Sequence, residues 1–536
     1  MYSSSLLQPG RRLAALLACC GGLLLGGCAT TTVAVDPLKL TAVSKETPVA
    51  VSITANTGEV SGFSSITLRR VQPPVKPGES APPAENFVMN LVAPGLARDT
   101  SLFIGALPPG EYQFVELNDH VNRKVLRMWS GTPLLGTFKV EAGKPTDLGR
   151  MIVTPVNLHV VFGRSTIVKS NAALMQRFAP EYARLFGADA GGGWTAERKE
   201  IDKVEEYARQ RPVGADCASE MADGSVAVAS RLGTVLMRSP QGRWRPLRAP
   251  GLESVLCVLP VDLPNAELVA VGEFGTLLRK ARGSDQLLPV DLGNLPPGNL
   301  IHLAGNAKLG WYLVHQKGSD VTLYHSRQLE GGYWQAQRRE SVALSLWNGQ
   351  NLIWAWHDER GTGYALSSGV MHRLDYASGA WSQTSTPESA RLLAYRRTQG
   401  GTIGILTSPG GGMGGVFAGV YYSRDEGEHW SAVQAPFSVK VSPVLQLKDG
   451  RMVMPGGVFS KAELQISGDD GKTWSHQGDY ELGRTLVPLS TGDMLDMDSG
   501  QHGLFTIRSS VNAGKTWRVE YSNFDKEAYD AQQKKK

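Results

Sequence analysis

Short runs in which hydrophobic and polar residues alternate dominate the first third of the chain. Between residues 48 and 163 these runs are rich in β-branched side chains, and a proline-rich loop at 73–83 divides them. Such alternation is typical of strands with one buried face. We therefore predict a small β-sandwich over 48–163, with strands within Val49–Ala55, Ser64–Val71, Asn86–Ala93, Leu102–Leu117 and Gly136–Gly149.

Helical periodicity is found only between residues 164 and 212. The stretch Asn171–Gly187 is amphipathic but contains Pro180, which predicts a break or a kink there. The stretch Thr195–Gln210 begins with a threonine cap and places three apolar residues on one face, namely Ile201, Val204 and Ala208. We predict a helical connector over 164–212.

A repeat occupies the rest of the chain. Three stretches of eight residues are nearly alike: SRDEGEHW ends at Trp430, SGDDGKTW at Trp474 and SVNAGKTW at Trp517, in steps of 44 and 43 residues. Earlier units with the same rhythm end at Trp244, near Leu287, at Trp334 and at Trp381. About seven units of this length match propeller blades of four short strands. The sequence predicts a mostly β fold with an approximately seven-bladed propeller over 213–523.

The eight-residue stretch is expected to be the turn between the third and fourth strands of a blade. Serine and aspartate side chains can accept hydrogen bonds from backbone amides within a turn, and glycine takes a positive φ without strain. The tryptophan then fills the gap between neighbouring blades. The residues predicted to hold these turns together are Ser423, Asp425, Gly427, Trp430, Ser467, Asp469, Gly471, Trp474, Ser510, Asn512, Gly514 and Trp517.

Two family resemblances follow from these residues. The pattern Ser-x-Asp-x-Gly-x-x-Trp resembles the Asp-box of BNR repeats, which occur in sialidases, sortilin-type receptors and photosystem-assembly-factor-like propellers. The Pro108-Pro109-Gly110 turn before an alternating strand resembles transthyretin-like or carboxypeptidase-regulatory-like sandwiches. The first resemblance implies a fold that hosts enzymes and binding proteins alike, and the second implies a spacer or docking module.

The N-terminus indicates export. Arg11-Arg12 precedes an apolar run from Leu13 to Leu25, and Gly26-Gly27-Cys28 follows, as in a secretory signal over 1–27. The segment LGGC resembles the lipobox of bacterial lipoproteins, in which the cysteine is diacylated; the alternative is a plain signal peptide with an incidental cysteine. Ala29 after the cysteine implies the outer membrane by the same resemblance. Residues 28–47 are expected to form a tether.

The cysteine content agrees with export, and the distribution of charge argues against a nucleic-acid partner. Once the signal is removed and Cys28 carries the lipid, Cys217 and Cys257 remain, so we predict a disulfide, with two buried free thiols as the alternative. The net charge of +5 is spread along the chain, which argues against nucleic-acid binding. Residues 524–536 are expected to be a charged, disordered tail.

Candidate sites are few. A sialidase-like site would need an arginine triad, and no Arg-Ile-Pro segment occurs here, so no catalytic residue is assigned. The glycine-rich loop that includes Gly410, Gly411, Gly412, Met413, Gly414 and Gly415 is a candidate binding loop, or else a flexible surface loop. Asp496 and Asp498 form a weak calcium candidate, with solvated edge residues as the preferred interpretation. The run Trp356–Arg360 offers His, Asp and Glu, which an ordinary charged turn also explains.

The function predicted from these features is non-catalytic. We expect an envelope lipoprotein whose propeller binds an envelope protein or a glycan through the loop face opposite the tryptophan turns, without a cofactor or a catalytic metal. A sialidase-like glycoside hydrolase is the alternative, and an assembly or stability factor for an envelope complex is a third interpretation.

Overall fold

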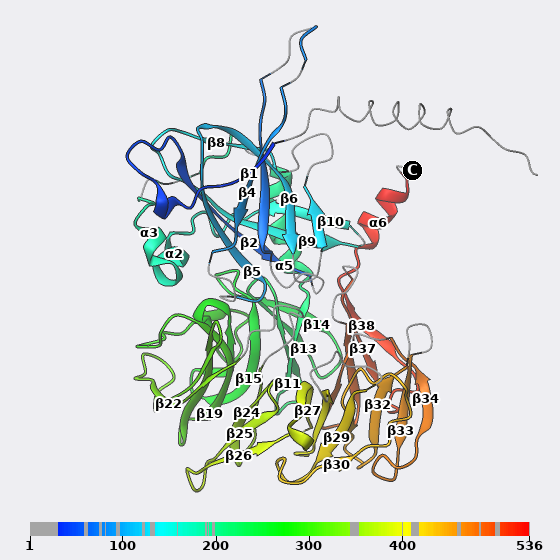
Figure 1. Ribbon diagram of the computed structural model, residues 1–536. Coiled ribbons are helices and arrows are strands. Elements are labelled where there is room, and N and C mark those ends of the chain that lie inside the picture. The colour runs from blue at the N-terminus through cyan, green and yellow to red at the C-terminus, as the bar shows by residue number, and fades with distance from the viewer. Residues whose placement is uncertain are drawn as a thin grey trace, which may run out of the picture.

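The computed structural model of the chain describes most of residues 30–534 (Figure 1). The description leaves out 58–62, 74–77, 81, 93–96, 120–123, 129–134, 158, 188–189, 191, 196–198, 343–352, 399, 409–416, 458–461, 482–483 and 499–503. Cys28 and the loop residues 410–415 therefore lie outside the described part of the chain.

Residues 30–164 form a β-sandwich, as the alternating runs predict. One sheet has the order β1-β4-β3-β6-β7 with β8 also paired to β6, and the other has the order β10-β9-β2-β5. Side chains from both sheets share one buried core that includes Ile53, Phe103, Tyr112 and Phe138. The strands are β1 (Thr30–Val33), β2 (Thr47–Ala55), β3 (Ser65–Arg70), β4 (Glu85–Asn90), β5 (Thr100–Leu107), β6 (Gly110–Asp119), β7 (Lys124–Arg127), β8 (Thr137–Val140), β9 (Thr146–Val156) and β10 (His159–Arg164).

The segment expected to be a tether is largely folded onto this sandwich. Strand β1 pairs with β4 in parallel, with Thr30 opposite Glu85. The short helix η1 (Pro37–Lys39) follows, and Val35 makes a bridge to Ala106 on β5. The expectation of a loose tether up to residue 47 is therefore wrong from residue 30 onward.

The connector holds four short helices. Helices α2 (Ala172–Phe178) and α3 (Pro180–Ala183) meet at Pro180, which begins α3 because a proline at the first helical position gives up no hydrogen bond. The second predicted helix is also divided, into α4 (Lys199–Asp202) and α5 (Val204–Gln210). In the described part of the chain, no helix is long and apolar enough to cross a membrane.

The repeat forms seven antiparallel sheets of four strands each, taken in chain order, and this confirms the seven-bladed propeller. We call the strands of each blade A to D. The A strands of blades 1 to 4 contact one another in chain order. Blades 1 to 3 comprise β11 (Gly214–Glu220), β12 (Val226–Ser230), β13 (Thr234–Arg238), β14 (Trp244–Arg248); β15 (Val255–Leu263), β16 (Ala266–Gly272), β17 (Leu277–Lys280), β18 (Leu287–Pro289); and β19 (Asn299–Asn306), β20 (Gly310–Lys317), β21 (Asp320–Ser326), β22 (Gln335–Ser341).

Blades 4 to 7 continue the same arrangement. They comprise β23 (Ile353–His357), β24 (Gly361–Leu366), β25 (Val370–Asp375), β26 (Trp381–Ser385); β27 (Arg391–Arg397), β28 (Ile403–Ser408), β29 (Gly419–Ser423), β30 (Ser431–Ala432); β31 (Leu445–Gln446), β32 (Met452–Gly456), β33 (Glu463–Ser467), β34 (Ser475–Asp479); and β35 (Arg484–Pro488), β36 (Met494–Asp498), β37 (Thr506–Ser510), β38 (Arg518–Ser522). Short helices η2 (Glu273–Gly275) and η3 (Pro387–Ser389) lie in the connections.

The tryptophans stand where the repeat places them, at or just before the start of strand D. Trp474 packs among apolar residues of blades 5 and 6, and Trp517 packs against a buried cluster that includes Leu464 and Ile466 of blade 6. The indole of Trp430 donates to the carbonyl of Ser385, at the end of blade 4 (3.0 Å). Each ring thus seals a seam with the preceding blade.

The ring closes between blades 7 and 1 without exchange of a strand. Apolar residues of both blades, among them Val228 and Phe505, form one cluster at the seam. Beside it, the carboxylate of Glu520 accepts from Nε (2.7 Å) and Nη2 (2.9 Å) of Arg238 and from the indole of Trp244 (3.1 Å). Burial alone would raise the pKa of Glu520, but the hydrogen bonds and charge of Arg238 hold it at about 2.

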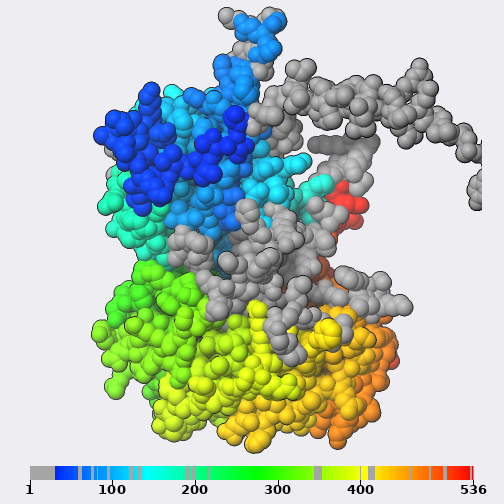
Figure 2. Space-filling model, viewed as in Figure 1, coloured from blue at the N-terminus to red at the C-terminus, as the bar shows by residue number. Residues whose placement is uncertain are grey.

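The propeller has two distinct faces. The A–B and C–D turns of each blade lie on one side, which we call the A–B face. The B–C turns and D–A connections lie on the other side, which we call the B–C face. The sandwich and its connector stand on one side of the propeller (Figures 1 and 2).

Removing the charge at the ring seam should weaken the closed propeller. Glu520→Gln leaves Arg238, only 11% exposed, without its carboxylate, so we expect a loss of about 3 kcal/mol in the free energy of unfolding. Urea titration at pH 7 measures it. Asp262→Asn, which breaks the exposed pair with Arg282, is the matched control and should cost less than about 0.5 kcal/mol. An equal loss of unfolding free energy in both variants would contradict the stabilising role of Glu520 at the seam between blades 7 and 1.

Candidate functional site

The sandwich is attached to the B–C face by a buried polar cluster. Glu273, in the B–C turn of blade 2, accepts hydrogen bonds from the amides of Arg98 and Asp99 (2.5 Å each) and from the hydroxyl of Thr100 (3.1 Å). Asp99 in turn pairs with Arg231, in the B–C turn of blade 1 (3.2 Å). All of these side chains but that of Arg98 are buried. One short segment of the sandwich therefore binds two blades at once.

Further contacts extend this attachment on both sides. Arg150 of the sandwich, itself buried, pairs with Glu253 in the D–A connection before blade 2 (3.0 Å). Phe178 of α2 packs edge-to-face on Phe274 of blade 2. Asn157 exchanges two hydrogen bonds with the backbone of Asp525, just after blade 7.

These contacts bear on two expectations. The B–C face was the predicted binding face, and the sandwich binds it at the B–C turns of blades 1 and 2 and just after blade 7. Figure 2 shows the sandwich against one side of the propeller. The tail was expected to be disordered, but Asp525 pairs with Arg211 (3.3 Å) and helix α6 (Lys526–Gln533) follows. The expectation of disorder is wrong for 526–533.

The A–B face carries a depression of ≈ 410 Å³. Its walls are the A–B turns of blades 5, 6 and 7, so it lies beside the centre of the ring. Lys448 is the one charged side chain among the described residues that line it. The neighbouring Asp449 is paired with Arg451 (2.6 Å). A depression of this size matches pockets that take a small ligand or a few side chains. The lining residues are Thr398, Gly400, Gln446, Leu447, Lys448, Gly450, Pro488, Leu489 and Ser490.

The three tryptophan turns act as clamps, as their residue types predict. In the turn of blade 6, the hydroxyl of Ser467 accepts from the amide of Gly471 (2.9 Å), and Asp469 accepts from the amide (2.8 Å) and the hydroxyl (2.6 Å) of Thr473. In blade 7, Asn512 accepts from the amide of Thr516 in the same way (2.9 Å). The side chains are thus committed to the turn itself.

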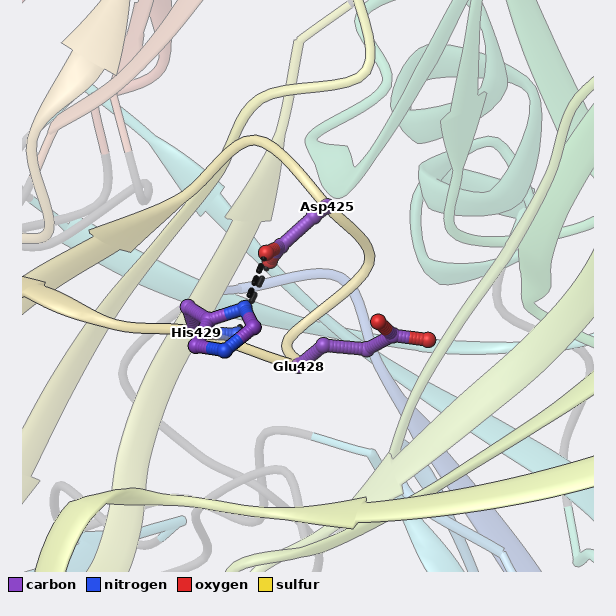
Figure 3. Close-up of side chains that lie close together, drawn as sticks. All are labelled: Asp425, Glu428 and His429. Atoms are coloured by element: carbon purple, nitrogen blue, oxygen red, sulfur yellow. Dashed lines mark hydrogen bonds and ion pairs between the residues drawn. The ribbon is translucent and has the colours of Figure 1, made fainter.

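One turn also gathers three groups that a metal ion could use, namely Asp425, Glu428 and His429 (Figure 3). His429 occupies the position of Thr473 in the next blade, and its Nδ1 lies 2.7 Å from Asp425. Both oxygens of Asp425 already accept hydrogen bonds within the turn. The clamp therefore explains the cluster, and we assign no metal to it.

The carboxylate pair in blade 7 differs from both interpretations of the sequence. Asp496 is fully buried, so the preferred expectation of a solvated edge residue is wrong for it. It accepts from Arg484 (2.5 Å) and Arg508 (2.6 Å) and from the hydroxyl of Tyr480 (3.2 Å), and Asp498 accepts from Arg484 (2.9 Å). Guanidinium groups thus stand where a calcium ion would have to bind.

The run that offers His357, Asp358 and Glu359 is also structural. Asp358 pairs with Arg397, and Arg397 pairs with Glu426 of the tryptophan turn in blade 5 (2.6 Å). This network joins blades 4 and 5 on the A–B face. Burial lowers the pKa of His357, so its imidazole is neutral at pH 7.

The two cysteines meet on the innermost strands of blades 1 and 2. The Sγ atoms of Cys217 and Cys257 lie 2.9 Å apart, as thiols. Nδ1 of His302, on the A strand of blade 3, is 3.4 Å from the sulfur of Cys257. Burial, and next the neighbouring His357, lower the pKa of His302 to about 3, so no imidazolium is present to stabilise a thiolate. This environment does not activate a nucleophile, and the disulfide stays a prediction.

Sequence reasoning missed the most heavily bonded polar groups. Glu273 and Arg484 lie within ordinary blade units, and nothing in the sequence singles them out. The acidic pair did single out Asp496, but as a calcium ligand and not as the buried partner of two arginines. The depression on the A–B face is equally hidden, because three turns about 45 residues apart form it.

Comparisons with known proteins add a likeness in fold only. No family model matches the sequence, and no curated protein matches it. Among solved structures, "YCF48 bound to D1 peptide" is similar with a TM-score of 0.40 and 15% identity, over 54% of this chain and 90% of that chain. Sqt1 of Saccharomyces cerevisiae is similar with a TM-score of 0.37 and 11% identity, over 59% of this chain and 86% of Sqt1. The computationally designed Ika8 protein is similar with a TM-score of 0.37 and 13% identity, over 59% of this chain and 88% of Ika8.

The attachment of the sandwich should depend on pH through Glu273. Burial, and next the charge of Asp99, raise the pKa of Glu273 to about 7. The folded state therefore binds the carboxyl proton of Glu273 more tightly than the unfolded state does. Protonation of Glu273 stabilises the fold at acid pH, and this stabilisation is lost as the pH rises from about 4.5 to 7. In the unchanged protein the free energy of unfolding should fall by about 3 kcal/mol between pH 4.5 and 8, as measured by urea unfolding. Glu273→Gln should remove this pH dependence.

The control for this pH profile is Glu388→Gln, at an exposed position in η3. It should leave the pH dependence of unfolding as in the unchanged protein. A slope that persists in Glu273→Gln would show that another group titrates in this range.

Oxidation of Cys217 and Cys257 to a disulfide should crosslink blades 1 and 2 and stabilise the protein. A disulfide would close a loop of 40 residues, for which the chain-entropy estimate is about 4 kcal/mol. We expect the protein purified from an oxidising compartment to resist alkylation of Cys217 and Cys257 until it is reduced, and to lose stability on reduction. Mass spectrometry after alkylation measures the first effect. Rapid alkylation of both thiols without reductant would contradict the disulfide.

Proposed function

We propose that this chain is an exported, lipid-anchored envelope protein that binds a protein partner through an exposed face of its propeller. Cys28 in the LGGC segment carries the lipid, and the outer membrane is its location. The observation that carries the binding role is the contrast between the two faces. The sandwich occupies the B–C face at blades 1 and 2, whereas the A–B face presents a depression lined by Lys448, which pairs with no described residue.

The polar groups of the propeller also favour binding over hydrolysis. A sialidase-like site would need arginines free to hold a substrate carboxylate. Arg484 and Arg508 converge on Asp496 of the chain itself, and Arg397 bridges Asp358 and Glu426. These arginines have internal partners, so they serve the blades rather than a ligand. A binding surface needs no such set of free groups.

Two faces remain as sites for the partner. The A–B face has the depression, and the B–C face has the 409–415 loop, which lies outside the described residues. We prefer the A–B face because the sandwich takes up much of the other one. A glycan partner and a role in assembling an envelope complex are the alternatives that the experiment separates.

Obstructing the depression should abolish binding. An ideal Cβ at Gly400 meets nothing within 4 Å, so Gly400→Tyr can project into the depression without disturbing the blades. Gly187, in the connector, is equally open, so Gly187→Tyr is the matched control. We expect a crosslinked pull-down from the native envelope, analysed by mass spectrometry, to lose its partner with Gly400→Tyr only.

A parallel variant tests the other face. Replacing the 409–415 loop (Pro409 to Gly415) with a short turn should leave the pull-down unchanged if the A–B face binds the partner. Loss of the partner in the loop variant alone would move the site to the B–C face. If no protein is captured by the unchanged chain, the proposal fails, and glycan panels with sialoside hydrolysis assays become the next measurement.

A further inference from the structure

The position of Cys28 restricts how the molecule can stand on a membrane. Cys28 lies two residues before Thr30, where β1 begins, and two residues span at most about 7 Å. A lipid attached to Cys28 therefore holds the start of β1 close to the headgroups. The orientation of the molecule then depends on which part of the sandwich surrounds Thr30.

Strand pairing places Thr30 at one end of the sandwich, which we call the anchor end. Thr30 lies opposite Glu85 at the start of β4, and Glu85 pairs with Arg70 at the end of β3 (3.2 Å). Arg70 also donates to the carbonyl of Pro109, in the turn between β5 and β6 (2.9 Å). The end of β5 in turn pairs with the start of β2, with Leu107 opposite Thr47.

The propeller is bound at the opposite end of the same strands. Asn56, just after β2, accepts from the amide of Val213 at the start of blade 1 (3.3 Å). Thr100, at the start of β5, donates to Glu273 (3.1 Å). Strand β2 runs from Thr47 to Ala55 between the two ends, and its nine residues span about 26 Å.

The connection between the two ends is stiff. The polypeptide after Thr30 is paired or bridged to the sandwich rather than loose, and Asp36 also accepts from Tyr182 of α3 (3.4 Å). At the propeller end, the ion pair between Arg231 and Asp99 is buried on both sides. Because both junctions are held by these contacts, the sandwich acts as a spacer of fixed length.

We infer that the anchor end of the sandwich rests on the lipid headgroups and that the A–B face of the propeller points away from the bilayer. This rests on the lipidation of Cys28 in the proposed function. The sandwich binds the B–C face, so the A–B face is on the far side of the propeller from the anchor. The anchor end also presents the side chains of Lys139 and Lys144, both more than half exposed, beside the carboxylates of Glu141 and Glu111.

This orientation defines the kind of partner that the depression can take. With its face directed into the aqueous compartment, the propeller meets a water-soluble protein or a protruding domain. A membrane-spanning segment beside the anchor would lie at the other end of the sandwich, at least about 26 Å from the ring.

The test uses the full-length lipidated protein in vesicles of phosphatidylethanolamine and phosphatidylglycerol with headgroup-nitroxide lipids. A fluorophore is attached at Lys144→Cys, at the anchor end, or at Lys448→Cys, on the A–B face. The protein without an introduced cysteine gives the background labelling. We expect severalfold stronger quenching at position 144 than at position 448. Equal quenching, or stronger quenching at position 448, would overturn the orientation.

Binding to the vesicles is scored separately by flotation. Cys28→Ser should remain in the soluble fraction, and its flotation with the vesicles would refute the lipid anchor and hence the proposed function. Quenching measured on floated, lipidated protein reports the orientation alone. Failure of the anchor and failure of the orientation are therefore distinguishable.

Discussion

A closed ring of blades is stable only when the last blade packs against the first as tightly as the other neighbouring blades pack against each other. In this propeller no strand is shared across the closure, so contacts made by side chains hold it. Apolar side chains pack around Phe505 at this closure, and Glu520 accepts buried hydrogen bonds from Arg238 and Trp244. The other seams use a tryptophan or leucine that opens strand D. The whole molecule depends on these inter-blade contacts, because a four-stranded sheet buries neither of its faces by itself.

Ring closure also creates the two faces on which function depends. The B–C face receives the sandwich through Glu273, Arg231 and Glu253, all of which contact residues of the first domain. The junction is buried and its charges are paired, so it resembles the interior of one domain more than a hinge, although Oδ1 of Asp99 has no hydrogen-bond partner among the described residues. The A–B face is the one through which we propose that the partner binds. An asymmetric molecule of this kind suits a protein that is held at one end and binds at the other.

The charged clusters show why composition is a poor guide to activity in this fold. Arginine and carboxylate groups converge at Asp496 and again at Arg397, as they would in an active site. In both places, however, each charge is neutralised by a partner from the same chain. Buried charges are tolerated in proteins when they are paired and hydrogen-bonded, and the seams between blades supply the partners. Such clusters stabilise the packing of the blades without leaving a group free for a substrate.

The amino-acid sequence by itself determined the repeat, the number of blades and the position of each tryptophan at the start of strand D. These features are local, since turn residues and alternation act within about 45 residues of chain. It also determined the break at Pro180, through the geometry of proline. The burial of Asp496, the depression at Lys448 and the docking of Asp99 on Arg231 were decided only by the tertiary structure. Each of these joins segments that are distant in the chain or buries a polar group, and a pattern along one segment carries no information about what another segment brings to it.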